Sequence, residues 1–209
     1  MNKPSLLLPQ DAPHTFTPRY SPWPQIRKSR IERLLPQAMQ LAGVDAWVVI
    51  CRENANDPLA MHVGGENAGG TAAFLFLLKD GNVRSIAISP WGEAIGLKDL
   101  GLHNEVIALE QPTKVWETLA RLLTDADPTK IAVNSSSRNV ADGLSWSQRG
   151  ELEQALGEQL RVRLVSSELL VLEWLSVKLP EEVDIMRKAG ELTVRIELEA
   201  YAQVIQIGR

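Results

Sequence analysis

The chain has 209 residues, with 22 basic and 26 acidic side chains, a net charge of −4 and a pI near 5.5. This length allows one or two domains with a self-supporting core, and the single Cys51 excludes an intrachain disulfide. Interspersed, mildly acidic charge argues against nucleic acid or an anionic membrane as the main partner, because both bind concentrated basic faces. We expect no membrane span and no signal peptide, and therefore a cytoplasmic protein.

The N-terminal segment is rich in proline. Six prolines lie within residues 1–24, a density that prevents regular helix and predicts an extended arm. This arm either packs along the domain surface through its aromatic residues or is a mobile tail. From Ile26 the apolar spacing becomes helical and closes at Gly43, and Pro36 is expected to kink or split that helix.

The central part of the chain alternates between strand and helix patterns. Apolar, β-rich runs predict strands at residues 46–51, 72–78, 83–88, 106–109, 131–133 and 162–165, and helical spacing predicts helices at 112–123, 148–156 and 167–175. The sequence Lys79-Asp80-Gly81-Asn82 is a strong hairpin turn, which inserts one antiparallel pair into this alternation. The pattern over residues 25–176 therefore predicts an α/β domain with a mixed sheet and flanking helices.

Residues 177–209 differ from this alternation. Pro180 is expected in the first turn of a helix, and Glu181 and Glu182 follow at the positive end of the helix dipole. The helix carries an apolar stripe formed by Ile185, Ala189, Leu192, Ile196, Ala200, Val204 and Ile207. A stripe that continues almost to residue 209 predicts a linking helix whose packing partner is missing. The alternative is a terminal helix that folds back on the sheet.

Most short motifs do not indicate catalysis. The glycine-rich stretch 62–71 favours a flexible turn over a phosphate-binding loop, because it lacks the lysine of such a loop and precedes a strand. The histidines His14, His62 and His103 have no metal-ligand spacing, so each is expected in a loop or on the surface. Cys51 is expected to be a buried structural thiol.

One polar loop is a candidate binding site. It begins with Arg52 and Glu53 and runs to Asp57, directly after the apolar strand at 46–51. Ligands in open α/β sheets bind where strands end, so this loop is the best intrinsic candidate, with a merely solvated loop as the alternative.

The strongest family signal lies at the start of the last helix. Residues 166–170, followed by Val177-Lys178-Leu179-Pro180-Glu181-Glu182-Val183-Asp184-Ile185-Met186-Arg187-Lys188-Ala189, resemble the junction between the two domains of creatinase, prolidase and aminopeptidase P. Softer agreement covers residues 43–49, 51–53, 133–135 and 141–145. The resemblance implies a creatinase-type, ribonuclease H-like N-terminal domain at 25–176, with residues 177–209 forming a linker helix toward a catalytic domain absent from this chain.

The same resemblance implies a function. The parent protein would be a proline-specific metallopeptidase, an Xaa-Pro aminopeptidase or dipeptidase, in which this domain shapes the substrate pocket and contributes oligomer contacts. Two divalent metal ions, manganese, cobalt or zinc, are expected in a pita-bread domain after Arg209. No catalytic or metal-binding residue is therefore assigned to this chain, which is not expected to be active alone. Its expected partners are that domain, a proline-containing peptide and further copies of itself.

Three residues are candidates for contact with substrate. The segment Ser89-Pro90-Trp91-Gly92-Glu93 is similar to the one that, in some members of the group, carries an aromatic residue into a neighbouring active site. Trp91 is therefore the first candidate, and the alternative is a Trp packed under its loop. Arg52 and Glu53 are weaker candidates.

A hypothesis from another class is a stand-alone α/β module that binds a peptide or protein without catalysis. It predicts that the domain itself covers the apolar stripe of the last helix.

Overall fold

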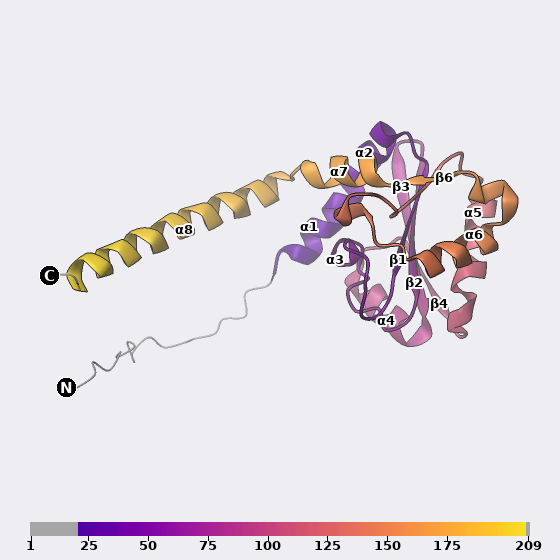
Figure 1. Cartoon of the computed structure of the whole chain (residues 1–209), viewed down its shortest axis with the longest axis horizontal. Coiled ribbons are helices and arrows are strands. Elements are labelled where there is room, and N and C mark those ends of the chain that lie inside the picture. The colour runs from indigo at the N-terminus through magenta and orange to yellow at the C-terminus, as the bar shows by residue number, and fades with distance from the viewer. Residues whose placement is uncertain (1–20, 208–209) are drawn as a thin grey trace.

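The structure is a computed structural model that describes residues 21–207, with side chains up to Ile205. Its strands form one sheet in the order β4-β3-β2-β1-β5-β6 (Figure 1). They are β1 (Ala46–Cys51), β2 (Ala72–Lys79), β3 (Asn82–Pro90), β4 (Glu105–Leu109), β5 (Ile131–Val133) and β6 (Leu164–Ser166). Only β2 runs antiparallel to its neighbours β1 and β3. The hairpin turn at Asp80 and Gly81, where both residues have positive φ, joins β2 to β3. The predicted mixed sheet is therefore confirmed.

Helices cover both faces of the sheet. One face carries α1 (Trp23–Ser29), the π-helical turn η1 (Arg30–Leu34), α2 (Leu35–Ala42), α3 (Ala60–Val63), α4 (Trp91–Leu100) and α7 (Glu168–Ser176). The other carries α5 (Val115–Ala126) and α6 (Trp146–Arg161), and the 3₁₀ turns are η2 (Pro112–Lys114) and η3 (Asn139–Ala141). The two helix groups lie on opposite sides of the sheet in Figure 1. The domain is thus a three-layer α/β/α arrangement, as the predicted mixed sheet with flanking helices requires.

Strand β1 shows why the sheet needs both layers. Its residues are all buried, and they alternate between the two cores: Trp47 and Val49 face the layer of α2 and α7, whereas Val48 and Ile50 face α5 and α6. Successive side chains of a strand point to opposite faces, so a strand that is apolar on both faces requires cover on both.

The first helical segment is interrupted before Pro36. Pro36 has no N–H to donate to the preceding turn. The chain forms the π-helical turn η1 just before it, in which the Leu35 N–H donates to the Arg30 carbonyl. Trp23 and Pro24, expected in the extended arm, instead begin α1, because proline fits the first turn of a helix. Residues 1–20 of the expected arm lie outside the described residues.

Helix α4 is the largest departure from the sequence prediction. The segment expected as a loop at residues 89–93 is instead the end of β3 and the first turn of α4. Gly92 and Gly96 interrupt the helical spacing of apolar residues, so the pattern in the sequence is too weak to reveal the helix.

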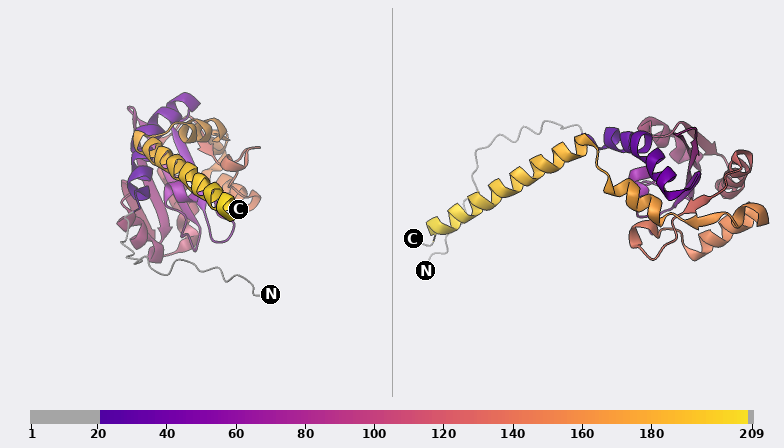
Figure 2. Two further views of the ribbon diagram at one scale, coloured as in Figure 1. Left: turned by 90° about the vertical axis from the view of Figure 1, so that its left-hand side faces the viewer. Right: turned by 90° about the horizontal axis from the view of Figure 1, so that it is seen from above.

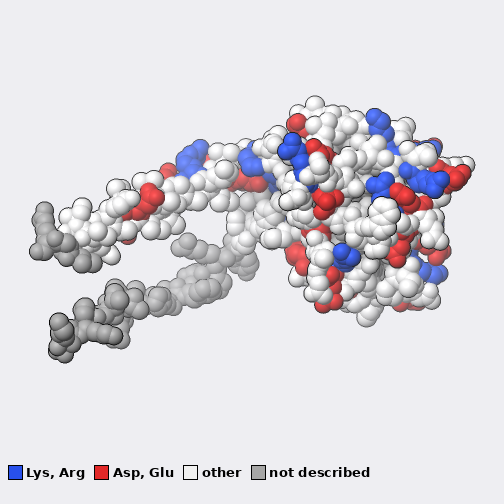
Figure 3. Space-filling model, in the orientation of Figure 1, with Lys and Arg blue, Asp and Glu red and all other residues white. Residues whose placement is uncertain are grey.

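Helix α8 (Pro180–Ile207) projects away from the domain (Figures 1 and 2). Every side chain from Val183 to Ile205 is exposed, including Ile196 at 56% and Tyr201 at 67%. The far half of α8 shows few charged atoms in Figure 3. The alternative of a helix folded back on the sheet is therefore wrong, and the predicted unpartnered stripe is exposed. No helix within residues 21–207 combines the length and apolarity needed to cross a bilayer.

Candidate functional site

The predicted site residues lie at one edge of the sheet. β1 and β3 run in the same direction on either side of β2, and the register aligns Ile50, Ala73 and Ile88. Arg52 stands two residues beyond Ile50, and Trp91 three residues beyond Ile88, so both follow the carboxyl ends of their strands at the same edge of the sheet. No hydrogen bond or ion pair within the described chain joins them to each other.

The loop after β1 is held by its own residues. Arg52 Nε donates to the Ala55 carbonyl at 3.1 Å, and the Arg52 N–H donates to Asn56 Oδ1 at 3.2 Å. Asn54 adopts φ +56°, a left-handed conformation that asparagine tolerates better than most residues. Glu53 is exposed. The loop therefore presents one carboxylate to solvent, while the Arg52 guanidinium is directed back onto the loop backbone.

Trp91 is the first residue of α4 and is 62% exposed. The alternative of a Trp packed under its loop is therefore wrong. Ile95, one turn further along α4, is also 54% exposed and extends the apolar surface on the outer side of the helix. An indole ring held open at the sheet edge can contact a ligand, and substrate contact by Trp91 stays a prediction.

The polar loop ends in a buried carboxylate. Asp57 is 3% exposed, and both of its carboxylate oxygens accept from Asn134 Nδ2, at 3.0 and 2.8 Å. Asn134 follows β5, and its Oδ1 accepts from Trp47 Nε1 at 2.9 Å and from Ser167 Oγ at 2.6 Å. The network follows the carboxyl ends of the neighbouring parallel strands β1 and β5, the part of a sheet at which α/β proteins commonly bind ligands.

Two buried groups have shifted pKa values of opposite sense. Burial raises the pKa of Asp57 to about 6, although hydrogen bonds from the Leu59 N–H and the Asn134 amide act against this rise. Burial lowers the pKa of His103 to about 4, although the hydrogen bond to the Val63 carbonyl acts against this fall. His103 Nε2 lies 2.9 Å from that carbonyl oxygen.

These shifts predict opposing contributions to stability. Between about pH 4 and 6 the folded state binds more protons at Asp57 than the unfolded chain does. The contribution of Asp57 to the unfolding free energy therefore falls as pH rises, by about 1.4 kcal/mol per pH unit. His103 binds fewer protons in the folded state than in the unfolded chain, so its contribution to the unfolding free energy falls as pH falls through the same window. We expect Asp57→Asn to make the unfolding free energy fall on acidification, and His103→Asn to make it rise. Urea unfolding between pH 4 and 7 measures both slopes relative to wild type; parallel curves for all three proteins would contradict the prediction.

The two histidines that the structure describes do not converge on a metal site. His62 lies in α3, where its ring packs edge-on against Trp23 and Trp174, with ring centroids 5.3 and 5.7 Å apart. The expectation of a loop or surface position is therefore wrong for His62, because aromatic neighbours cover it, and His14 lies outside the described residues. Within residues 21–207, no three His, Cys, Asp or Glu side chains are grouped to hold a metal ion.

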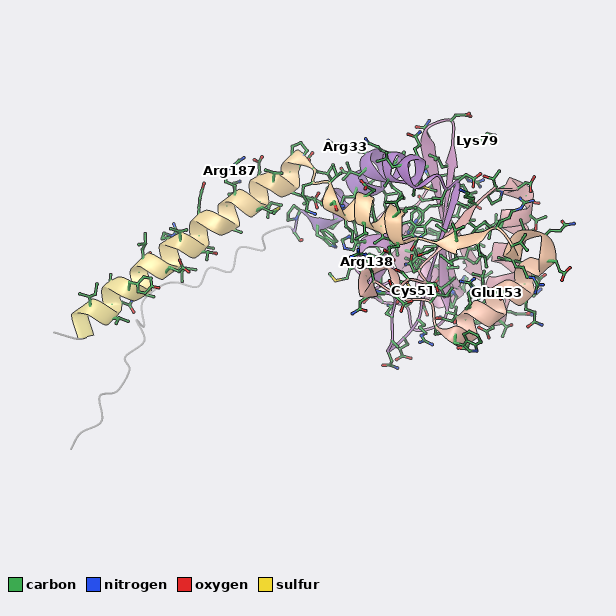
Figure 4. The ribbon with its side chains drawn as sticks, turned by 45° about the horizontal axis from the view of Figure 1, so that its top comes forward. Arg33, Cys51, Lys79, Arg138, Glu153 and Arg187 are labelled. Atoms are coloured by element: carbon green, nitrogen blue, oxygen red, sulfur yellow. The ribbon has the colours of Figure 1, made fainter. Side chains whose placement is uncertain are left out.

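A cavity of about 360 Å³ lies between the glycine-rich loop and α4. Phe74 of β2 and Ser89 of β3 line it from the sheet, and Leu97 lines it from α4. Close packing holds the loop on the sheet, because a Cβ built on Gly65 would overlap the side chain of Cys51. Cys51 is a buried free thiol, as predicted (Figure 4), and burial raises its pKa. Sequence reasoning missed this cavity because it depends on the unexpected α4.

The start of α8 is fixed to the domain by two arginines. The buried Arg30 donates through Nη1 to Glu182 Oε2 at 2.6 Å and to the Val177 carbonyl at 3.1 Å, and through Nη2 to the Trp174 carbonyl. Arg33, near the start of α8 in Figure 4, pairs with Glu181 at 3.1 Å. The sequence indicated only a helix-dipole role for these acids, whereas the structure shows that they anchor the helix.

Comparison with known proteins relies on structure alone, because no family model and no curated protein matches the chain. An X-Pro aminopeptidase from Thermotoga maritima matches 78% of this chain with a TM-score of 0.55 and 18% identity. An Xaa-Pro dipeptidase from Bacillus anthracis matches 79% of it with a TM-score of 0.51 and 15% identity. The matches cover 42% and 39% of those proteins, so the chain spans about two fifths of their length.

A third solved structure matches almost end to end. It is an Xaa-Pro aminopeptidase chain from Streptococcus thermophilus, 97% of which is matched by 72% of this chain, with a TM-score of 0.50 and 12% identity. At identities this low, the structural match shows a shared fold alone. The chain therefore has the mixed α/β fold of a part of the Xaa-Pro dipeptidases and aminopeptidases, in agreement with the resemblance noted at residues 166–189.

Proposed function

We propose that the chain is the non-catalytic N-terminal domain of a metal-dependent Xaa-Pro peptidase, where it shapes the substrate pocket and contributes to oligomer contacts. The observation that carries this proposal is the combination of an anchored start and an exposed remainder in α8. Arg30 and Glu182 fix the direction in which the helix leaves the domain, and the apolar residues beyond Val183 need a partner that the domain does not provide. A catalytic domain continuing from α8 is that partner.

Within this proposal the substrate faces the edge of the sheet that carries the predicted site residues. Trp91 offers an open indole face to an apolar ring such as proline, and Arg52 and Glu53 flank the position from β1. The described residues do not fit a dinuclear metal centre, so we assign hydrolysis and its metal ions to the catalytic domain. A cytoplasmic location and self-association belong to the same proposal.

The alternative of a stand-alone binding module predicts that the domain covers the stripe of α8. That stripe is exposed along its described length, which argues against this alternative.

The proposal is tested on the protein from its native cells. Antibodies raised against residues 21–176 are expected to recover a product larger than the 23.1 kDa of this chain. We expect this product to cleave Xaa-Pro peptides and to lose that activity in EDTA. The purified 209-residue chain with added manganese serves as the matched control and is expected to be inactive. A native product of 23.1 kDa without peptidase activity, or strong turnover by the 209-residue chain, would overturn the proposal.

A further inference from the structure

The cavity beside α4 is open to solvent along the helix, where Gly92 and Gly96 are exposed. Gly92 and Gly96 of α4 both line it, and a Cβ built on either glycine would meet no atom within 4 Å. The walls are otherwise mostly hydrocarbon, from Phe74, Leu97 and Leu100. A volume of about 360 Å³ is at the lower end of the range for small-molecule pockets. The cavity therefore has room for a ligand of about the size of a single amino-acid side chain with its head group.

Among the described residues that line this cavity, Glu93 is the only ionisable one. Its Oε1 accepts from the Gly70 N–H at 2.9 Å, a bond that holds the glycine-rich loop against α4. Its Oε2 receives only the Ser89 hydroxyl, at 3.4 Å, which is long for such a bond. No ion pair within residues 21–207 includes Glu93. One oxygen of the carboxylate is thus committed to the fold, and the other is free to accept.

The lining selects for one kind of ligand charge. A carboxylate beside hydrocarbon walls favours a positively charged donor, because a charge-assisted hydrogen bond is about twice as strong as a neutral one. The lining has no Lys, Arg or His to pair with an acidic group on the ligand. A zwitterion or an anion is therefore disfavoured in this cavity relative to a simple cation.

We propose that the cavity binds a small organic ammonium ion with an apolar body. Its N–H group donates to Glu93 Oε2, and its hydrocarbon part packs against Phe74, Leu97 and Leu100. The cavity lies wholly within the α/β domain, and Trp91 is not among its lining residues. The proposal is therefore independent of the proposed peptidase function, and either can fail without the other.

The test compares 3-methylbutylamine with its neutral isostere 3-methylbutan-1-ol, titrated into the ¹⁵N-labelled 209-residue chain. We expect the amine to bind saturably, with the largest amide shifts at Gly70 and along α4, and to bind at least about tenfold more tightly than the alcohol. Glu93→Gln keeps an acceptor for the Gly70 N–H and is expected to weaken amine binding at least about tenfold. Gly96→Leu fills the open space and is expected to abolish it.

The matched control is Asp99→Asn, which removes the same charge from the exposed side of the same helix and is expected to leave the amine affinity unchanged. Equal affinities for amine and alcohol would overturn the proposal. So would unchanged amine binding in Glu93→Gln, or the absence of saturation below roughly 10 mM. Unfolding midpoints of the variants are measured alongside, and Glu93→Gln decides the outcome if Gly96→Leu does not fold.

Discussion

Arg30→Met is expected to lower the free energy of unfolding by about 4 kcal/mol, the scale measured when one partner of a buried ion pair is removed. The Arg30 side chain is 2% exposed, and its partner Glu182 is 17% exposed. The substitution leaves the Glu182 carboxylate without its cation and two carbonyls, of Trp174 and Val177, without their donor. It also removes the guanidinium that lies 5.5 Å from the Trp174 ring centroid. Urea unfolding monitored by fluorescence and circular dichroism measures the loss.

The chain offers a matched control for this prediction. Arg33 pairs with Glu181 at the same junction, but these side chains are 49% and 54% exposed. Water and salt screen such a pair, so Arg33→Met is expected to cost less than about 1 kcal/mol. Equal effects of the two substitutions would show that burial of the Arg30 pair does not determine how α8 is anchored.

Gly143→Ala is also expected to destabilise the protein strongly, by lowering the free energy of unfolding by about 3 kcal/mol. The backbone at Gly143 lies against the buried carboxylate of Asp57, and its N–H donates to the Asn134 carbonyl at 3.1 Å. A Cβ would overlap the carboxylate and lie 2.8 Å from Pro58 Cδ. The methyl group therefore displaces Asp57 from Asn134 and leaves a buried carboxylate without its hydrogen bonds.

Gly150→Ala is the control for this substitution. Gly150 lies inside α6, and a Cβ there would meet nothing within 4 Å. Alanine is the better helix former by about 1 kcal/mol, so this variant is expected to be unchanged or slightly more stable. Chemical denaturation of both variants gives the comparison, and a Gly143→Ala protein as stable as wild type would mean that the loop moves away without cost.

The elements that the sequence predicted well are those with strong local signals. Strand β1 is apolar at every position, and α5 has a regular apolar face. Asp80-Gly81 is a sequence typical of tight hairpin turns, in which both central residues have positive φ. Each of these signals depends on residues within one element, so no knowledge of distant contacts is needed. Helix α4 was missed because its glycines weaken the apolar spacing, and the cavity beside it was missed for the same reason.

The candidate site was only partly predictable. Sequence reasoning selected the loop from Arg52 to Asp57 because polar residues follow a buried strand, and the structure confirms its position at the sheet edge. It could not separate the two ends of that loop. Glu53 is exposed, whereas Asp57 is buried against Asn134, a residue 77 positions away in the sequence. Nothing near Asp57 in the sequence indicates that partner.

The sequence by itself determined the mixed α/β class, the hairpin between β2 and β3 and the unpartnered character of the last helix, because periodicity and turn chemistry are local properties. Only the tertiary structure decided which charged side chains are buried and paired. Arg30 reaches Glu182 across 152 residues, and Glu93 reaches Gly70 across 23 residues. Such pairings depend on how the layers pack, and a desolvated charge must find its partner wherever the fold places one.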